Sequence, residues 1–415
     1  MKKRTFIIIS IGILFILSSC ISKPDKDLDM GKNHIQNPTE ENLEETEEVD
    51  EVEELIKSMT LDEKIGQLFI LGLNGTEIDD HIINMIEKNH IGGLILFKYN
   101  ISHEKQAVEL LNSLKKANRS NPVPLFLSID EEGGRVTRLP SSFHKLPEAK
   151  RIGDINDRTI SLEYGRILGE RVKSLGFNMN FAPVLDINSN PQNPVIGDRA
   201  FGSNIERVVD NGLQVMEGIK SNNVIPVVKH FPGHGDTSMD SHIDIPLVDK
   251  DMKELEELEL VPFVEAIKNG ADGIMVGHIL FPQIDKDYPA TLSYEIINSL
   301  LREKLSYDGV VFSDDMTMGA IVKNYSLGEA AVKFLKAGGD ILLICHGYEN
   351  QIEVLNRVKE EIHKGSISEE ELDEKVYRII KLKEKYDIKD WLIESVDLEE
   401  INSRTMKLLN EIDSR

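Results

Sequence analysis

The sequence has little cysteine, fewer basic than acidic residues and no long apolar segment. Only Cys20 and Cys345 occur among its 415 residues, which excludes a framework of disulfides. The net charge of −24 argues against binding to nucleic acid and against electrostatic attraction to anionic lipid. The apolar run near the N-terminus, TFIIISIGILFIL, is shorter than the roughly 20 residues that a membrane-spanning helix requires. The hydrophobic content of 40% is that of an ordinary globular domain.

Residues 1–20 have the features of a signal peptide. A basic segment, MKKR, precedes the apolar run, and LSSC ends it at Cys20. Small residues before a cysteine resemble the lipobox of bacterial lipoproteins, which implies that Cys20 is lipidated and becomes the first residue of the mature protein. Two or more acyl chains would anchor it stably to the cell membrane, on the extracytoplasmic side. Cys345 lies in the apolar run DILLIC and is expected to be a buried, unreactive thiol.

Residues 21–51 are expected to form a flexible acidic tether. From Asp25 to Glu54 there are 13 acidic residues against Lys26 and Lys32, a balance of −11. So polar a segment cannot bury enough apolar surface to offset the entropy lost on ordering. As a coil it would span on the order of 30 Å and hold the following domain away from the membrane.

From residue 52 onward, apolar runs alternate with amphipathic helical patterns, one of which covers residues 249–270. Eight runs are rich in Ile, Leu and Val: LFILGL, GGLILFK, PLFLSID, FNMNFAPVLDI, VIPVVKH, DGIMVGH, DGVVFSDD and DILLICHG. This alternation predicts parallel strands buried on both faces, and eight units favour a (β/α)8 barrel over residues 52–387 rather than a doubly wound open sheet. Residues 388–415 have room for one short helix, not for a second α/β domain.

Polar side chains follow most of these runs at their C-terminal ends. They are Asp130, Asp186, Lys229, His230, His278, Asp314, Asp315, Cys345 and His346. Barrel enzymes build their active sites on the rim where the strands end. The sequence therefore predicts an active site on that rim.

The segment KHFPGHGDTSMDSH, from Lys229 to His242, is compatible with three chemistries. His230, His234 and His242 could bind zinc, but Phe-Pro-Gly breaks the helix that would place the first two on one face. Lys229 could form a Schiff base, as lysines at barrel strand ends do. The third interpretation is an acid/base loop of a hydrolase, and the remaining motifs favour it.

Six motifs resemble those of the β-N-acetylhexosaminidases of glycoside hydrolase family three, in order and spacing. They are IDEEGGRVTRLP, NFAPVLDIN, IGDRAFG, KHFPGHGDTSMDSH, GIMVGHILFP and VVFSDDMTMGA. Many members of that family carry a second α/β domain after the barrel, which is not expected in residues 388–415.

The resemblance implies that Asp314 is the nucleophile and that His242, with Asp240 as its partner, is the general acid/base. An imidazole suits that role because its ordinary pKa lies near neutrality, so it can donate and then accept a proton. Asp240 would fix the tautomer of the ring and stabilise the imidazolium. Asp315 is expected to point to the opposite face of the strand, away from the sugar.

The resemblance also implies substrate contacts by Asp130, Arg138, Arg199, Lys229 and His230. Sugar hydroxyls need fixed charged or bidentate partners, and these side chains provide them. Arg199 could instead form a purely structural ion pair with Asp198 or Asp186. His234 and His278 could contact the substrate or support other residues, and the sequence does not decide between these roles.

The resemblance implies a retaining exo-β-N-acetylhexosaminidase acting on terminal N-acetylglucosamine of peptidoglycan fragments or other amino-sugar glycans. We expect a monomer with no metal or organic cofactor, bound to the membrane only through its lipid. The alternatives are a β-N-acetylglucosaminide phosphorylase, a β-glucosidase or β-xylosidase of the same family, and a sugar-binding lipoprotein without catalysis.

Overall fold

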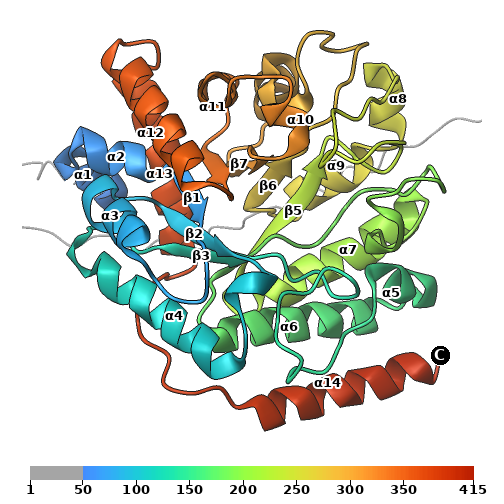
Figure 1. Cartoon of the computed structure of the whole chain (residues 1–415). Coiled ribbons are helices and arrows are strands. Elements are labelled where there is room, and N and C mark those ends of the chain that lie inside the picture. The colour runs from blue at the N-terminus through green and yellow to red at the C-terminus, as the bar shows by residue number, and fades with distance from the viewer. Residues whose placement is uncertain (1–49) are drawn as a thin grey trace, which may run out of the picture. The chain divides into compact units, whose positions relative to one another are not determined.

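Eight short strands lie side by side in chain order and close into a barrel in the computed structural model, which describes residues 50–415 (Figure 1). All neighbouring strands are parallel, and β1 pairs with β8. The strands are β1 (Phe69–Gly72), β2 (Gly93–Leu96), β3 (Phe126–Ile129), β4 (Met179–Asn180), β5 (Ile225–Phe231), β6 (Gly273–Val276), β7 (Val310–Asp315) and β8 (Ile341–Ile344). The predicted (β/α)8 barrel is confirmed, and the open sheet is excluded. The signal peptide, most of the acidic tether and Cys20 lie outside the described residues.

The strands are buried because both of their faces are covered. One face points into the barrel and the other against the surrounding helices, so apolar side chains occupy consecutive positions. The barrel closes where Leu71 of β1 pairs with Ile344 of β8. At this seam a Cβ on Gly72 would lie 1.9 Å from the carbonyl oxygen of Cys345, so only glycine allows the two strands to approach.

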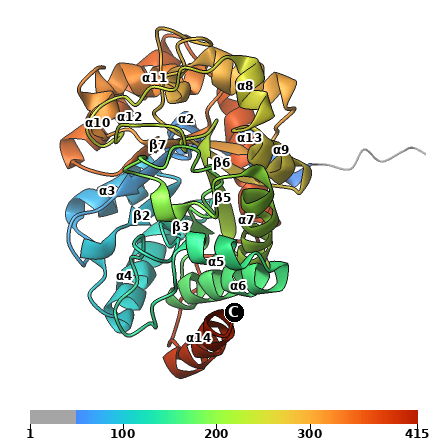
Figure 2. The same cartoon turned by 90° about the vertical axis from the view of Figure 1, so that its right-hand side faces the viewer.

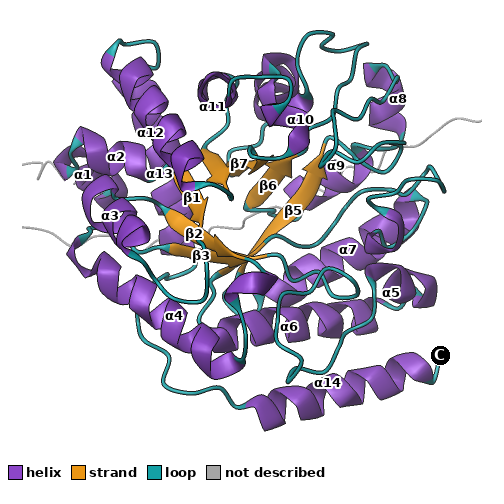
Figure 3. Ribbon diagram, viewed as in Figure 1, coloured by secondary structure: helices purple, strands orange, loops and turns teal. Residues whose placement is uncertain are grey.

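Helices form a ring outside the barrel, as Figure 3 shows by colour. The N-terminal half contributes α1 (Glu51–Ser58), α2 (Leu61–Gly66), α3 (Asp80–Asn89), α4 (Glu104–Ala117), α5 (Ala149–Ile155), α6 (Arg158–Leu175) and α7 (Ile205–Lys220). The C-terminal half contributes α8 (Met252–Glu257), α9 (Val261–Lys268), a π-helix (Glu295–Lys304), α10 (Gly319–Val322), α11 (Leu327–Lys336), α12 (Tyr348–His363) and α13 (Glu369–Lys385). Local sequence fixes their ends: the side chain of Asp157 accepts N–H bonds at the start of α6, and Gly176, at φ 108°, ends it.

Two segments differ from the sequence expectation. The predicted fourth strand, residues 177–187, is regular only at Met179–Asn180, and then touches β5 through a single bridge between Val184 and Lys229. Pro183 has no N–H to donate to a strand ladder, which interrupts the pairing. The helix expected over residues 249–270 is divided into α8 and α9, because Pro262 begins a new helix in its first turn.

The C-terminal residues add α14 (Leu398–Asp413), which packs along α6 outside the ring (Figure 2). Its apolar side chains Ile401, Leu408 and Ile412 are buried, and Arg404 pairs with Glu170 of α6 at 2.8 Å. None of the helices within residues 50–415 has the length and apolar composition needed to cross a membrane.

Candidate active site

A cavity of about 450 Å³ opens at the C-terminal ends of the strands. It is lined by all eight residues for which the sequence predicted a catalytic or substrate-binding role: Asp130, Arg138, Arg199, Lys229, His230, Asp240, His242 and Asp314. They come from the ends of β3, β5 and β7 and from the loops that follow β3, β4 and β5. The fold thus brings together residues separated by up to 184 positions in the chain, as expected for the rim of a barrel.

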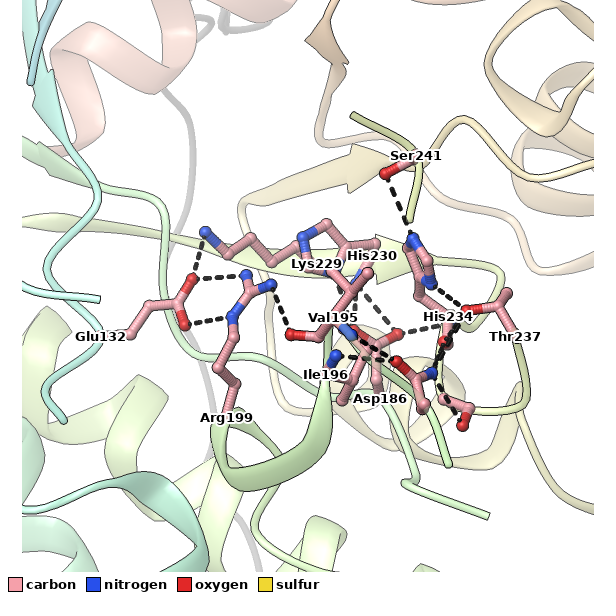
Figure 4. A network of polar contacts seen from close by, with 12 residues as sticks. Glu132, Asp186, Val195, Ile196, Arg199, Lys229, His230, His234, Thr237 and Ser241 are labelled. Carbon is pink, nitrogen blue, oxygen red and sulfur yellow. Dashed lines mark hydrogen bonds and ion pairs between the residues drawn. The ribbon is translucent and has the colours of Figure 1, made fainter. Parts of the chain in front are cut away.

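One wall of the cavity is a cluster of buried and half-buried opposite charges, of which Figure 4 shows Glu132, Arg199 and Lys229. Lys229 Nζ lies 2.6 Å from Asp130 Oδ1 and 2.7 Å from Glu132 Oε1, and Arg199 binds both carboxylate oxygens of Glu132 at 2.8 Å. Burial alone would lower the pKa of Lys229, but the two carboxylates outweigh burial and raise it, so the amine stays protonated. A protonated amine is no nucleophile, which argues against the Schiff-base alternative.

Arg138 faces the same wall from the loop after β3. Its Nη2 lies 3.6 Å from Asp130 Oδ2, and its guanidinium lies 5.9 Å from the ring centroid of Phe97. Arg138 Nε is buried and has no hydrogen-bond partner within the described part of the chain. A buried donor of this kind is costly unless a ligand accepts its hydrogen, which fits a substrate contact.

Asp186 organises the start of the histidine-rich loop. It accepts a hydrogen bond from the His234 peptide N–H at 2.7 Å and lies 2.7 Å from His230 Nδ1. His234 is buried, with its Nδ1 2.8 Å from Thr237 Oγ1 and its Nε2 3.4 Å from Ser241 Oγ. Burial, reinforced by the neighbouring His230, lowers the pKa of His234 to about 4. His234 therefore holds the loop together as a neutral ring.

Asp314 is the penultimate residue of β7, and its half-buried carboxylate lines the cavity. Burial alone would raise its pKa, but His278, His230, the Asp315 N–H and Lys229 together hold the pKa below its ordinary value. The group is therefore an ionised carboxylate at neutral pH. His278 supports this corner, with Nδ1 2.8 Å from Thr291 Oγ1 and Nε2 2.9 Å from the carbonyl oxygen of Asp315.

Asp315 does not lie where strand alternation predicted. It also lines the cavity, where its carboxylate accepts hydrogen bonds from Thr317 and from the Cys345 N–H. The pairing of β7 with β8 shifts register between Phe312 and Asp315, so regular alternation no longer holds at the strand end. The Asp315 carboxylate is thus engaged by several donors, whereas the Asp314 carboxylate accepts a hydrogen bond from the Asp315 N–H at 2.8 Å. Cys345 is buried as predicted, and burial together with Asp315 raises the pKa of its thiol.

His242 and Asp240 form a pair on the loop after β5. His242 Nδ1 lies 2.8 Å from Asp240 Oδ1, and the same oxygen accepts the His242 peptide N–H at 2.8 Å. Burial would raise the pKa of Asp240, but these contacts with His242 lower it overall, so it is ionised. The imidazole is 67% exposed, which leaves its Nε2 free to meet a substrate at the cavity mouth.

Helix α10 supports this loop from the β7 side. The Ala320 N–H donates to the Ser241 carbonyl at 3.1 Å, and Lys323 Nζ donates to the Ile243 carbonyl at 2.6 Å. Gly319 allows the close approach, because a Cβ there would lie 2.4 Å from the His242 carbonyl oxygen. The segment that follows Asp314 in the chain therefore supports the loop that contains His242.

Sequence reasoning missed the carboxylate that pairs with Arg199. Arg199 pairs with Glu132, not with Asp198 or Asp186, which bind Arg135 and His230 instead. The doubled acid in IDEEGG was the available signal for Glu132. His346, which the sequence analysis placed on the rim without assigning it a role, borders the cavity after β8, with its ring centroid 4.9 Å from that of Phe97. Within residues 50–415 no three His, Cys, Asp or Glu residues are arranged as a set of metal ligands.

Comparison with known proteins places these features in a family. The model of the glycosyl hydrolase family 3 N-terminal domain matches residues 60–382. The chain is 34% identical, over 75% of its length, to beta-hexosaminidase A of Pseudoalteromonas piscicida, of which it spans 56%.

Two solved structures are also similar. A family 3 β-N-acetylglucosaminidase from Paenibacillus sp. is 40% identical, with a TM-score of 0.80, covering 85% of this chain and 68% of that one. Zinc-bound CbsA from Thermotoga neapolitana is 31% identical, with a TM-score of 0.72, covering 79% of this chain and 69% of that one. The barrel, its six motifs and these matches agree that the chain belongs to glycosyl hydrolase family 3.

Proposed function

We propose that the protein is an exo-acting, retaining β-N-acetylhexosaminidase that removes terminal non-reducing N-acetylglucosamine. The observation that carries the proposal is that an ionised, half-buried Asp314 and the His242–Asp240 pair line one cavity. A second wall of the same cavity offers the charged cluster around Lys229 to sugar hydroxyls. The β-hexosaminidase and β-N-acetylglucosaminidase names of the relatives support the choice of sugar.

The first chemical step would form the bond between Asp314 and the anomeric carbon of the sugar. As the glycosidic bond breaks, its oxygen takes the proton of the His242 imidazolium, and the leaving group departs as an alcohol. Asp240 stabilises the imidazolium before transfer and keeps Nδ1 bonded, so that Nε2 is the atom that exchanges the proton.

The second step would reverse these roles. Neutral His242 takes a proton from water, the resulting oxygen nucleophile attacks the anomeric carbon, and the bond to Asp314 breaks to restore its carboxylate. Two displacements at one carbon retain its configuration. An imidazole carries no negative charge when neutral, so phosphate could replace water as the acceptor. This feature makes a phosphorylase the second candidate.

The proposed setting is the outer side of the cell membrane. Lipidated Cys20 would anchor the protein there, and the acidic segment 21–51 would carry the barrel. We propose peptidoglycan fragments or other amino-sugar glycans at that location as the natural substrates.

The direct test compares aryl β-N-acetylglucosaminide, β-glucoside and β-xyloside as substrates. We expect cleavage of the first to exceed that of the others by orders of magnitude, with release of free sugar whether or not phosphate is present. Sugar phosphate as the main product would establish the phosphorylase, and preference for glucoside would overturn the amino-sugar proposal. Because a Thermotoga relative binds zinc, the assay is repeated after exhaustive chelation, which should leave activity unchanged.

A further inference from the structure

Glu132 is the buried carboxylate of the site to which no role has yet been assigned. Its side chain is 6% exposed, and its two oxygens contact Arg199 twice and Lys229 once, at 2.7–2.8 Å. The two cations come from different parts of the fold, Arg199 from the loop after β4 and Lys229 from β5. Among residues 50–415, Glu132 is therefore the carboxylate that joins them.

The backbone of Glu132 is itself fixed on both sides. Its N–H donates to the Val136 carbonyl at 3.0 Å, and its carbonyl accepts the buried hydroxyl of Tyr164 at 2.9 Å. A carboxylate held this way can set the positions of the cations bonded to it. Asp130 also binds Lys229, but it is more exposed, at 17%, which leaves it able to accept a hydroxyl from a ligand.

We propose that Glu132 is a positioning residue that holds Lys229 and Arg199 at a fixed separation, with Lys229 protonated, for binding adjacent hydroxyls of the non-reducing sugar. The inference rests on the proposed function and extends it. Glu132 would contact the two cations and not the sugar. If Glu132 instead formed only a structural salt bridge, it would stabilise the fold but would not affect how the sugar binds. The positioning role and the structural role therefore predict different results when Glu132 is replaced.

The charge around Lys229 provides one distinguishing measurement. The charged and titratable groups that face this corner of the cavity are Asp130, Glu132, Arg138, Asp186, Arg199, His230 and Asp314. Burial and Arg199 favour the neutral amine, whereas Asp130 and Glu132 favour the ammonium. Loss of the Glu132 charge should therefore lower the pKa of Lys229. As pH rises, Lys229 would then lose its proton earlier, and sugar binding would weaken at a lower pH than in the wild type.

The test is Glu132→Gln, measured by binding of free N-acetylglucosamine and by the pH profile of kcat/KM. We expect sugar affinity to fall by about 10- to 100-fold, which is the usual loss when the partner that orients a ligand-binding group is removed. We also expect the alkaline limb of the pH profile, where kcat/KM declines with rising pH, to move to lower pH. Glu132→Asp retains the charge but withdraws it by one methylene. It should restore the alkaline limb while leaving affinity below that of the wild type.

Asp340→Asn is the matched control. Asp340 is equally buried and also bridges two cations, Arg302 and Arg378, but it precedes β8 at the opposite end of the barrel. This variant should lose stability while keeping the wild-type sugar affinity and pH profile.

Two outcomes would overturn the positioning role. One is a Glu132→Gln protein that is destabilised like Asp340→Asn but keeps wild-type affinity and alkaline limb. If Glu132→Gln does not fold, the aspartate variant decides, and unchanged sugar affinity in it would contradict the proposal. Failure of wild-type protein to bind or cleave N-acetylglucosaminides would instead refute the proposed function, so the two failures are distinguishable.

Discussion

Asp314 and His242 have separable tasks in the proposed mechanism. Asp314→Ala should abolish activity on every substrate, because the covalent bond cannot form. An aryl leaving group of low pKa hardly needs a proton, so His242→Ala should still form the glycosyl-enzyme and then stall. Rapid-mixing kinetics should show a burst followed by slow turnover, and azide should restore turnover.

Asp240→Asn provides the graded comparison, because it changes only the charge and orientation of the imidazole. Its defect should resemble that of His242→Ala but be smaller. If His242→Ala lost aryl-substrate cleavage as completely as Asp314→Ala, without burst or azide rescue, the assignment of the acid/base would be wrong.

His234 should make the fold sensitive to acid. Burial, with His230 nearby, lowers its pKa from 6.5 to about 4, so the unfolded chain binds a proton at a pH where the folded protein does not. Stability contributed by the neutral ring is present above pH 6.5 and is lost as pH falls towards 4, by up to about 3 kcal/mol. In urea unfolding at pH 7 and pH 4.5, His234→Gln should lose less free energy of unfolding than the wild type. An equal loss in both proteins would contradict this.

At the residue scale, the sequence identified side chains whose chemistry is visible without knowing their neighbours. Strand ends and motifs pointed to Asp314 and Lys229, and both line the cavity. Glu132 was missed because its importance lies in which cations it meets, and Arg199 is 67 positions away. The face of Asp315 was wrongly predicted because a register shift is a property of the strand pair, not of one strand.

The support that α10 gives to the loop after β5 can be tested by adding one methyl group at Gly319. Gly319→Ala places a Cβ 2.4 Å from the His242 carbonyl oxygen, which is closer than two such atoms can lie, so the loop must move. Small displacements of a catalytic group cost on the order of 100-fold in rate, and we expect kcat to fall by roughly that amount. The control is Val322→Ala on the same helix, where the side chain is 45% exposed. Wild-type kcat in Gly319→Ala would show that the loop does not rely on α10.

At the scale of elements, hydrophobic periodicity located the strands but not their lengths. The fourth run was read as a long strand, yet only two residues pair regularly, because Pro183 cannot donate to the ladder. Pro262 likewise divided a helix whose apolar pattern continues through the break. Both errors, in the length of the fourth strand and in the continuity of the helix, arise from backbone hydrogen bonding. The pattern of apolar side chains indicates this bonding only indirectly.

Attachment of the whole protein to a membrane depends on a segment outside the described residues. If LSSC is a lipobox, Cys20→Ala should remove incorporation of labelled fatty acid and either release the protein from membranes or leave the signal uncleaved. Cell fractionation with fatty-acid labelling measures both effects. Unchanged membrane association with normal cleavage would refute lipid anchoring.

The support of the β5 loop by α10 also bears on how such barrels can be recombined. The proposed nucleophile and the helix under the proposed acid/base belong to one βα unit, while the histidine belongs to another, two strands earlier. A chimera that joins two related barrels between β6 and β7 would keep every named side chain. It would, however, place the β5 loop of one parent against the α10 helix of the other. Crossovers before β5 or after α10 would keep the two units together. Barrel shuffling within this family should therefore succeed or fail according to where the join falls, even when all catalytic residues are retained.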